Sequence, residues 1–175
     1  MKYPLPLRII HWLSALIIIA LIVLGAYMTP FSMDNVEHSE SLYFWHKSFG
    51  ILAFIVVILR LLYRSKANLP ALPEDMPSHE KLAAKLVHKA LYVLMVLVPV
   101  LGYIQSCVYP YSSGVHFFGM LLPEIFFDSQ KIFDVVNIIH KTLAYSLLAL
   151  VIIHALGAIK HRLFDKENDV FKRIL

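Results

Sequence analysis

The sequence predicts an all-α membrane protein, an antiparallel bundle of four transmembrane helices with both termini in the cytoplasm. Of its 175 residues, 59% are hydrophobic and the mean hydropathy is +0.69, far above the range of soluble domains. Four apolar stretches are each long enough to cross the ~30 Å hydrocarbon core of a bilayer. Thirteen of the sixteen Lys and Arg residues fall at the termini and in the second connection, which the positive-inside rule assigns to the cytoplasm.

The four expected spans form one domain over residues 1–175. They run from about 7 to 28, 42 to 63, 86 to 108 and 133 to 164. Pro4 and Pro6 precede the first span and Pro30 follows it, where helix boundaries are expected. A first apolar segment of this length, with a histidine and no small-residue cleavage site, predicts a retained helix and not a signal peptide.

The connections carry their own signals. Three prolines in 64–85 predict an extended inner loop that leads through an amphipathic stretch into the third span. The outer loop 29–41 is short and acidic, with Asp34 among its charges. The outer loop 109–132 has an apolar middle, Val115 to Pro123, that is too short to span a bilayer. We expect this middle part to fold onto the outer face as an interfacial cap.

The composition also limits the chemistry. Cys107 is the single cysteine, so no internal disulfide can form. A C-x-x-C-H motif is likewise impossible, and any haem would be held by coordination alone, as a b-type haem. The net charge of +4 follows from topology and does not indicate nucleic-acid binding.

The fourth span carries two histidines, His140 and His154, fourteen residues apart. That interval is ~21 Å along a helix and nearly four whole turns, so both imidazoles leave the same face. His11 lies at the depth of His154 near the cytoplasmic side, and His46 lies at the depth of His140 near the outer side.

An antiparallel bundle can turn such side chains inward from facing helices. The sequence thus predicts two bis-histidine sites, each able to fill both axial positions of a haem iron. For His140 and His154 the alternative is two buried histidines that bond to ordinary neighbours, which is less favoured because intramembrane ionisable residues are costly and usually functional.

Glycines recur at related depths. Gly25 is fourteen residues after His11, and Gly102 lies at the matching depth in the third span. Both would lie beside the outer haem, where a missing side chain admits a porphyrin edge, and Gly50 could do the same. Close helix packing is the alternative explanation for these glycines.

Other candidate residues belong to the inner site. Arg60 could pair with a haem propionate there, or it could simply extend to the membrane surface. His88 has no evident axial partner, and we expect it to support the ligands. His161 could contact a propionate or a quinone, or be a solvated interfacial residue. We expect no ligand role for the remaining loop histidines, His38, His79 and His116.

The motifs taken in order resemble the bacterial cytochrome b561 family of the inner membrane, over nearly the whole chain. They are Arg8-Ile9-Ile10-His11-Trp12-Leu13, Trp45-His46-Lys47-Ser48-Phe49-Gly50, Arg60-Leu61-Leu62-Tyr63-Arg64, His88-Lys89-Ala90-Leu91-Tyr92, Pro99-Val100-Leu101-Gly102-Tyr103, Phe117-Phe118-Gly119, His140-Lys141-Thr142-Leu143-Ala144-Tyr145, His154 and Lys160-His161. The resemblance implies two b haems and electron exchange with ubiquinone. The family's ligand positions match His11, His46, His140 and His154.

One member of that family oxidises superoxide on the periplasmic side, so the resemblance implies a superoxide:ubiquinone oxidoreductase. Lys47 and Lys141 lie next to the outer histidines and could steer an anion. The outer loops carry six acidic residues against three lysines, which does not favour an anionic donor. A cytochrome b subunit for a separate dehydrogenase or hydrogenase, served by a periplasmic donor, is one alternative. A haem-free transporter or scaffold is another, and a homodimer remains open.

Overall fold

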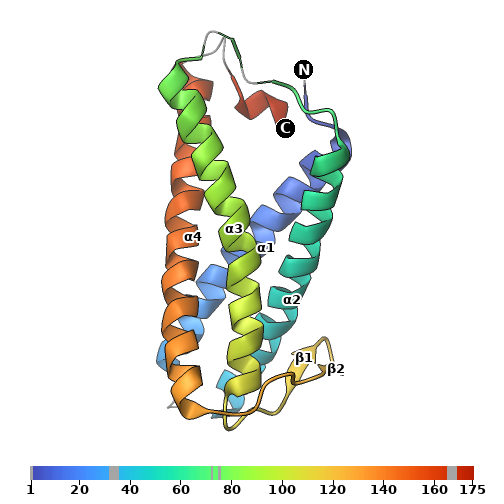
Figure 1. Cartoon of the computed structure of the whole chain (residues 1–175), viewed down its shortest axis with the longest axis vertical. Helices are drawn as coiled ribbons and strands as arrows, with labels where there is room; N and C mark the ends of the chain where they lie inside the picture. The colour runs from blue at the N-terminus through green and yellow to red at the C-terminus, as the bar shows by residue number, and fades with distance from the viewer. Residues whose placement is uncertain (1, 32–35, 72, 75, 165–168) are drawn as a thin grey trace.

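The computed structural model confirms a bundle of four long helices (Figure 1). It describes residues 2–31, 36–71, 73–74, 76–164 and 169–175, and Asp34 and the side chain of His38 lie outside that description. The elements in chain order are α1 (Leu5–Phe31), α2 (Val36–Lys66), α3 (Ser78–Val108), β1 (Val115–Phe117), β2 (Met120–Leu122), α4 (Gln130–Phe164) and the 3₁₀ turn η1 (Phe171–Arg173).

All four helices are long and apolar enough to cross a membrane, which makes this a multi-pass membrane protein. α2 and α3 begin six and eight residues earlier than the hydropathy pattern predicted, at Val36 and Ser78. A hydropathy window detects only the apolar part of a helix, whereas the first turns of α3 carry charged residues and are still helical. His79 therefore lies on α3 and not in a loop.

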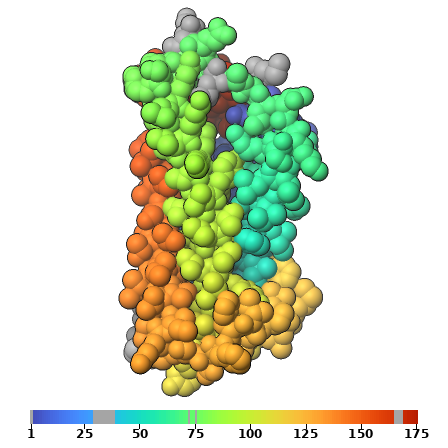
Figure 2. Space-filling model, in the orientation of Figure 1, coloured from blue at the N-terminus to red at the C-terminus, as the bar shows by residue number. Residues whose placement is uncertain are grey.

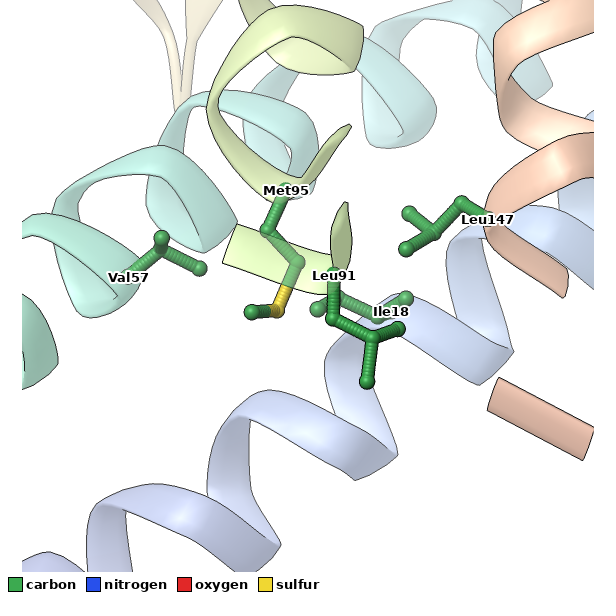
Figure 3. Close-up of a cluster of buried hydrophobic side chains, with 5 residues drawn as sticks. All are labelled: Ile18, Val57, Leu91, Met95 and Leu147. Atoms are coloured by element: carbon green, nitrogen blue, oxygen red, sulfur yellow. The ribbon is translucent and has the colours of Figure 1, made fainter. Parts of the chain in front are cut away.

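The helices alternate in direction, so both chain termini lie at one end of the bundle, called here the terminal end (Figure 1). The opposite end carries β1 and β2 and is called the hairpin end. Midway between the two ends lies one buried cluster, to which α1, α2 and α4 each contribute one side chain and α3 contributes two (Figure 3). Its members are Ile18, Val57, Leu91, Met95 and Leu147.

Among the described residues, far more of the large apolar side chains are exposed on the outside of the bundle than are buried. Many on each helix are more than two-fifths exposed, as expected where the surrounding solvent is lipid. In Figure 2 the chain between α3 and α4 wraps the hairpin end and interrupts this surface.

The outer segment that was expected to fold onto the outer face as an interfacial cap forms a small antiparallel β-hairpin at the hairpin end. Phe118 (φ 47°) and Gly119 (φ 91°) form the two-residue turn. Positive φ at both central residues matches the twist of a hairpin, and glycine adopts it without steric cost. Ser48, which is fully buried on α2, accepts a hydrogen bond from Phe118 N (3.0 Å) and donates one to the carbonyl of His116 (3.4 Å). The hairpin is thereby fixed to the helix that carries His46.

Candidate functional site

Four half-buried histidines form two pairs, one near each end of the bundle. His11 of α1 faces His154 of α4, with ring centroids 6.2 Å apart and ring planes at 71°. His46 of α2 faces His140 of α4, at 6.5 Å and 80°. The structure thus brings together the two pairs that the sequence predicted from depth. The first is called here the terminal-end pair and the second the hairpin-end pair.

The spacing within each pair suits one metal ion between two imidazoles. Two ring nitrogens that each lie about 2 Å from one metal place the ring centroids roughly 6 Å apart. The side-chain Nδ1 atoms of His11 and His46 are buried and have no hydrogen-bond partner among the described residues. Within the described part of the chain, no three His, Cys, Asp or Glu side chains gather around a point. The donor set therefore fits a haem, whose porphyrin supplies the other four ligands, better than a bare ion.

The hairpin-end pair is braced by backbone from the neighbouring helices. His140 Nδ1 lies 3.0 Å from the carbonyl oxygen of Val98 on α3, where the ring N–H can donate. A hydrogen bond at this nitrogen leaves Nε2 for a metal and fixes the plane of the ring. The ring lies against Gly102, where an added Cβ would meet His140 Cε1 at 3.1 Å. Only a residue without a side chain lets the imidazole approach α3 this closely.

Gly25 plays the same part for the other member of the pair. An added Cβ there would lie 3.2 Å from His46 Cε1. The two glycines therefore accommodate the imidazoles themselves, whereas the sequence reasoning assigned their space to a porphyrin edge. Gly50 has no atom within 4 Å of an added Cβ, so the expected room exists beside it.

The terminal-end pair has a charged neighbour on α2. Arg60 is close enough to His11 and His154 to interact with both electrostatically. Its guanidinium donates to Ser14 Oγ (3.2 Å) and lies 5.6 Å from the centre of the Tyr92 ring. The Ser14 hydroxyl and the Tyr92 ring are neutral, and no carboxylate stands against the positive charge of Arg60 among the described residues. A half-buried guanidinium of this kind is suited to an anionic group of a ligand.

The remaining candidates occupy different surroundings. The ring of His88 touches His154 edge to face at 5.1 Å, which is shorter than two imidazoles on one metal require. His161 is buried, and its Nε2 lies 3.5 Å from Glu80 Oε2, so it is not the solvated residue of the alternative reading. Lys47 is half-buried and donates to the Gly114 carbonyl (3.3 Å), whereas Lys141 is exposed. Of the two lysines beside the outer histidines, only Lys141 is free to meet a diffusing anion.

Sequence reasoning missed the contacts made by the end of the chain. Trp12, the residue after His11, donates its indole N–H to the Ile174 carbonyl at 3.0 Å. His116, expected in a loop, lies in β1 and its backbone accepts from Ser48. Neither contact has a local sequence signal, because each joins residues far apart in the chain.

Comparison with known proteins places the chain among related sequences. The family described as prokaryotic cytochrome b561 matches residues 2–175. The Escherichia coli (strain K12) protein named cytochrome b561 homolog 2 is 33% identical over 168 residues, covering 94% of this chain and 86% of the relative. Cytochrome b561 homolog 1 of the same organism is 26% identical over 127 residues, covering 73% of this chain and 71% of the relative.

Proposed function

Since this chain belongs to the prokaryotic cytochrome b561 family of haem b electron-transfer proteins in membranes, we propose that it binds two b haems in the bacterial inner membrane. The observation that carries the proposal is the pair of facing imidazoles at each end of the bundle, 6.2 and 6.5 Å apart. Bound haem supplies one-electron redox chemistry. Histidine at both axial positions leaves no open coordination site, which suits electron transfer and not oxygen binding.

The protein's own residues would hold and tune the two groups. Val98 fixes the ring plane of His140 at the hairpin end. Arg60 would pair with a propionate at the terminal end, since its charge lacks a described carboxylate partner. His88 would support His154 by contact. The positive-inside rule assigns the terminal end to the cytoplasm and the hairpin end to the periplasm.

The proposed reaction is a superoxide:ubiquinone oxidoreductase. Each superoxide anion gives up one electron at the hairpin end and leaves as O₂. Two electrons and two protons convert one ubiquinone to ubiquinol. Quinone exchange is proposed at the terminal end, where Arg60, His88 and His161 offer donors to its carbonyl oxygens.

The charge of the hairpin end supports a second candidate. Among the described residues of this end, the exposed acids outnumber the exposed lysines. The acids are Glu40, Glu124, Asp128 and Asp134, and the lysines are Lys131 and Lys141. A net negative surface slows the approach of an anion but can dock a basic protein. The second candidate is therefore a cytochrome b subunit that exchanges electrons with a separate dehydrogenase or hydrogenase.

The first experiment counts haem by the pyridine haemochrome assay in the purified protein and in two variants. The wild type should bind two haems per chain. His11→Ala should lose the terminal-end haem and keep the other, and His46→Ala should do the reverse. One haem or none in the wild type would refute the two-site proposal. Loss of a whole haem in His88→Ala, with both retained in His11→Ala, would refute the assignment of ligands.

The second experiment identifies the donor. Pulse-generated superoxide should reduce the haems faster at low salt than at high salt, and more slowly in Lys141→Glu. Lys131→Glu makes the same change of net charge farther from His140, and it is the matched control. Insensitivity to salt and to both variants, together with a dehydrogenase that copurifies, would favour the second candidate.

A further inference from the structure

The terminal end is closed by the last residues of the chain, Asp169–Leu175, called here the C-terminal cap. The cap joins the two helices that carry the terminal-end pair. On the α4 side, buried Asp169 accepts hydrogen bonds from the Arg162 side chain (2.7 Å) and the Lys172 backbone (3.1 Å). On the α1 side, the backbone N–H of Tyr3 donates to the Arg173 carbonyl at 2.9 Å. Figure 1 shows the cap lying between the end of α4 and the start of α1.

Trp12 is the side chain through which the cap reaches the interior. Its indole N–H donates to the Ile174 carbonyl (3.0 Å), and its ring meets Phe171 edge to face at 6.4 Å. The same ring meets His11 edge to face at 5.3 Å. One indole therefore contacts both the cap and an imidazole of the terminal-end pair.

His11 lacks the support that the hairpin-end pair receives. The Nδ1 atom of His140 has the Val98 carbonyl as a partner, whereas the Nδ1 atom of His11, like that of His46, is buried with no partner in the described part of the chain. An added Cβ at Gly25 or Gly102 would meet an imidazole of the hairpin-end pair, and no glycine stands in that relation to His11. The ring contacts of His11 in the described part of the chain are with His154, its partner, and with Trp12.

We propose that Trp12 is a positioning residue for His11 and that the C-terminal cap holds Trp12 in place. The cap would thus determine how firmly the terminal-end site retains its ligand, although it lies outside the membrane-spanning helices. This inference rests on the proposed function, because it assigns His11 to a haem site. The competing explanation is that Trp12 is an ordinary interfacial anchor, as tryptophans at membrane surfaces often are.

The chain offers a matched control in Trp45. It directly precedes His46, and at 45% its exposure equals that of Trp12. Its ring contacts are Phe44, Phe49 and Phe118, and its indole N–H has no described acceptor. Both tryptophans could anchor the bundle in lipid, but only Trp12 links an axial candidate to the end of the chain.

The test compares Trp12→Phe, Asp169→Asn and Trp45→Phe with the wild type. The readouts are the rate of haem transfer to excess apomyoglobin and the low-spin EPR signal, which reports ligand orientation. Trp12→Phe keeps an aromatic ring but loses the hydrogen bond to Ile174, so the terminal-end haem should leave about fivefold faster, as for one lost hydrogen bond. Asp169→Asn should act in the same direction without touching α1. Trp45→Phe should leave the terminal-end haem unchanged.

Wild-type rates and EPR signals in both Trp12→Phe and Asp169→Asn would overturn the proposal. If the terminal-end haem left equally fast in Trp45→Phe, Trp12 would be an ordinary interfacial anchor, and this result would also overturn the proposal. Retention of the hairpin-end haem shows that each variant is folded. If the wild type held no terminal-end haem, the proposed function would fail, and hydrogen exchange would decide the cap's role. Faster exchange at residues 7–14 in Asp169→Asn would support the coupling, and unchanged exchange would overturn it.

Discussion

Replacing Gly102 with alanine tests whether the hairpin-end pair depends on a close approach between helices. The added Cβ would lie 3.1 Å from His140 Cε1, and ordinary contacts begin at 3.4 Å, so the ring must retreat by about 0.3 Å. The same ring uses Nδ1 to reach the Val98 carbonyl at 3.0 Å, and the retreat lengthens that hydrogen bond. Loss of such a bond to a metal ligand typically costs 10–100-fold in metal affinity.

The expected result is a selective loss. In Gly102→Ala the hairpin-end haem should be up to about tenfold more weakly bound, because the retreat weakens this bond without breaking it, and the haem count should fall below two. The helix itself should not suffer, because alanine favours a helix over glycine by ~1 kcal/mol. Gly157→Ala is the control, since an added Cβ there meets nothing within 4 Å. The assays are haem counting, a redox titration and a thermal melt of each protein.

The reasoning would be refuted by a Gly102→Ala protein that keeps two haems with the same potentials and EPR signals as Gly157→Ala. A loss of the terminal-end haem alone would also contradict it, because Gly102 contacts the hairpin-end pair. A Gly25→Ala variant, in which the added Cβ would lie 3.2 Å from His46 Cε1, should repeat the effect from the opposite side.

Three further predictions follow from the same structure. Arg60→Leu removes a positive charge that favours the reduced form of the terminal-end haem, so the reduction potential of that haem should fall by roughly tens of millivolts in a redox titration, with the hairpin-end potential unchanged. A shift confined to the hairpin-end haem would contradict the position of Arg60 beside the terminal-end site. Ser48→Ala removes both hydrogen bonds between the Ser48 hydroxyl and the hairpin, so proteolysis at the hairpin should become faster and the free energy of unfolding should drop by about 1–3 kcal/mol, measured in a thermal melt. An unchanged cleavage rate would show that the hydrogen bond from Lys47 to the Gly114 carbonyl is enough to hold the hairpin on α2. Arg162 and the Lys172 backbone hold the pKa of Asp169 below its ordinary value, although burial opposes them. The hydrogen bonds of the cap are therefore fully formed above pH ~4, the ordinary pKa of an aspartate, and weaken as the pH falls through the lowered pKa. Trp12 fluorescence should report this change with pH, and Asp169→Asn should abolish it.

The sequence was sufficient to predict the bundle and the facing histidines because both follow from regular helix geometry. Fourteen residues return a helix to the same face, so His140 and His154 had to lie toward one side at two depths. Gly25 and Gly102 were found at the correct depth by the same rule. Their contacts with imidazoles could not be predicted, because they depend on how closely two helices approach.

The parts that sequence reasoning missed are those that depend on long-range contacts. Only Gly119 marks the Phe118–Gly119 turn in the sequence, because phenylalanine is not a residue that hairpin turns favour, and the two strands are only three residues long each. The hydrogen bond from Trp12 to Ile174 joins residues 162 positions apart in the sequence, and no local sequence pattern predicts it. The early start of α3 was hidden by the charged residues of its first turns.

The position of both inward histidines of α4 has a consequence for biogenesis. α1 contacts α4 far less than it contacts α2, and under the two-haem proposal His11 would share a haem with His154, just as His46 would with His140. A ribosome that has released only α1, α2 and α3 has therefore delivered one half of each pair and no complete site. Cofactor capture must wait for insertion of the last helix, and a nascent chain that stalls before α4 carries two unmatched imidazoles. Such a chain would be recognisable to membrane quality control by the polar groups it cannot satisfy in lipid.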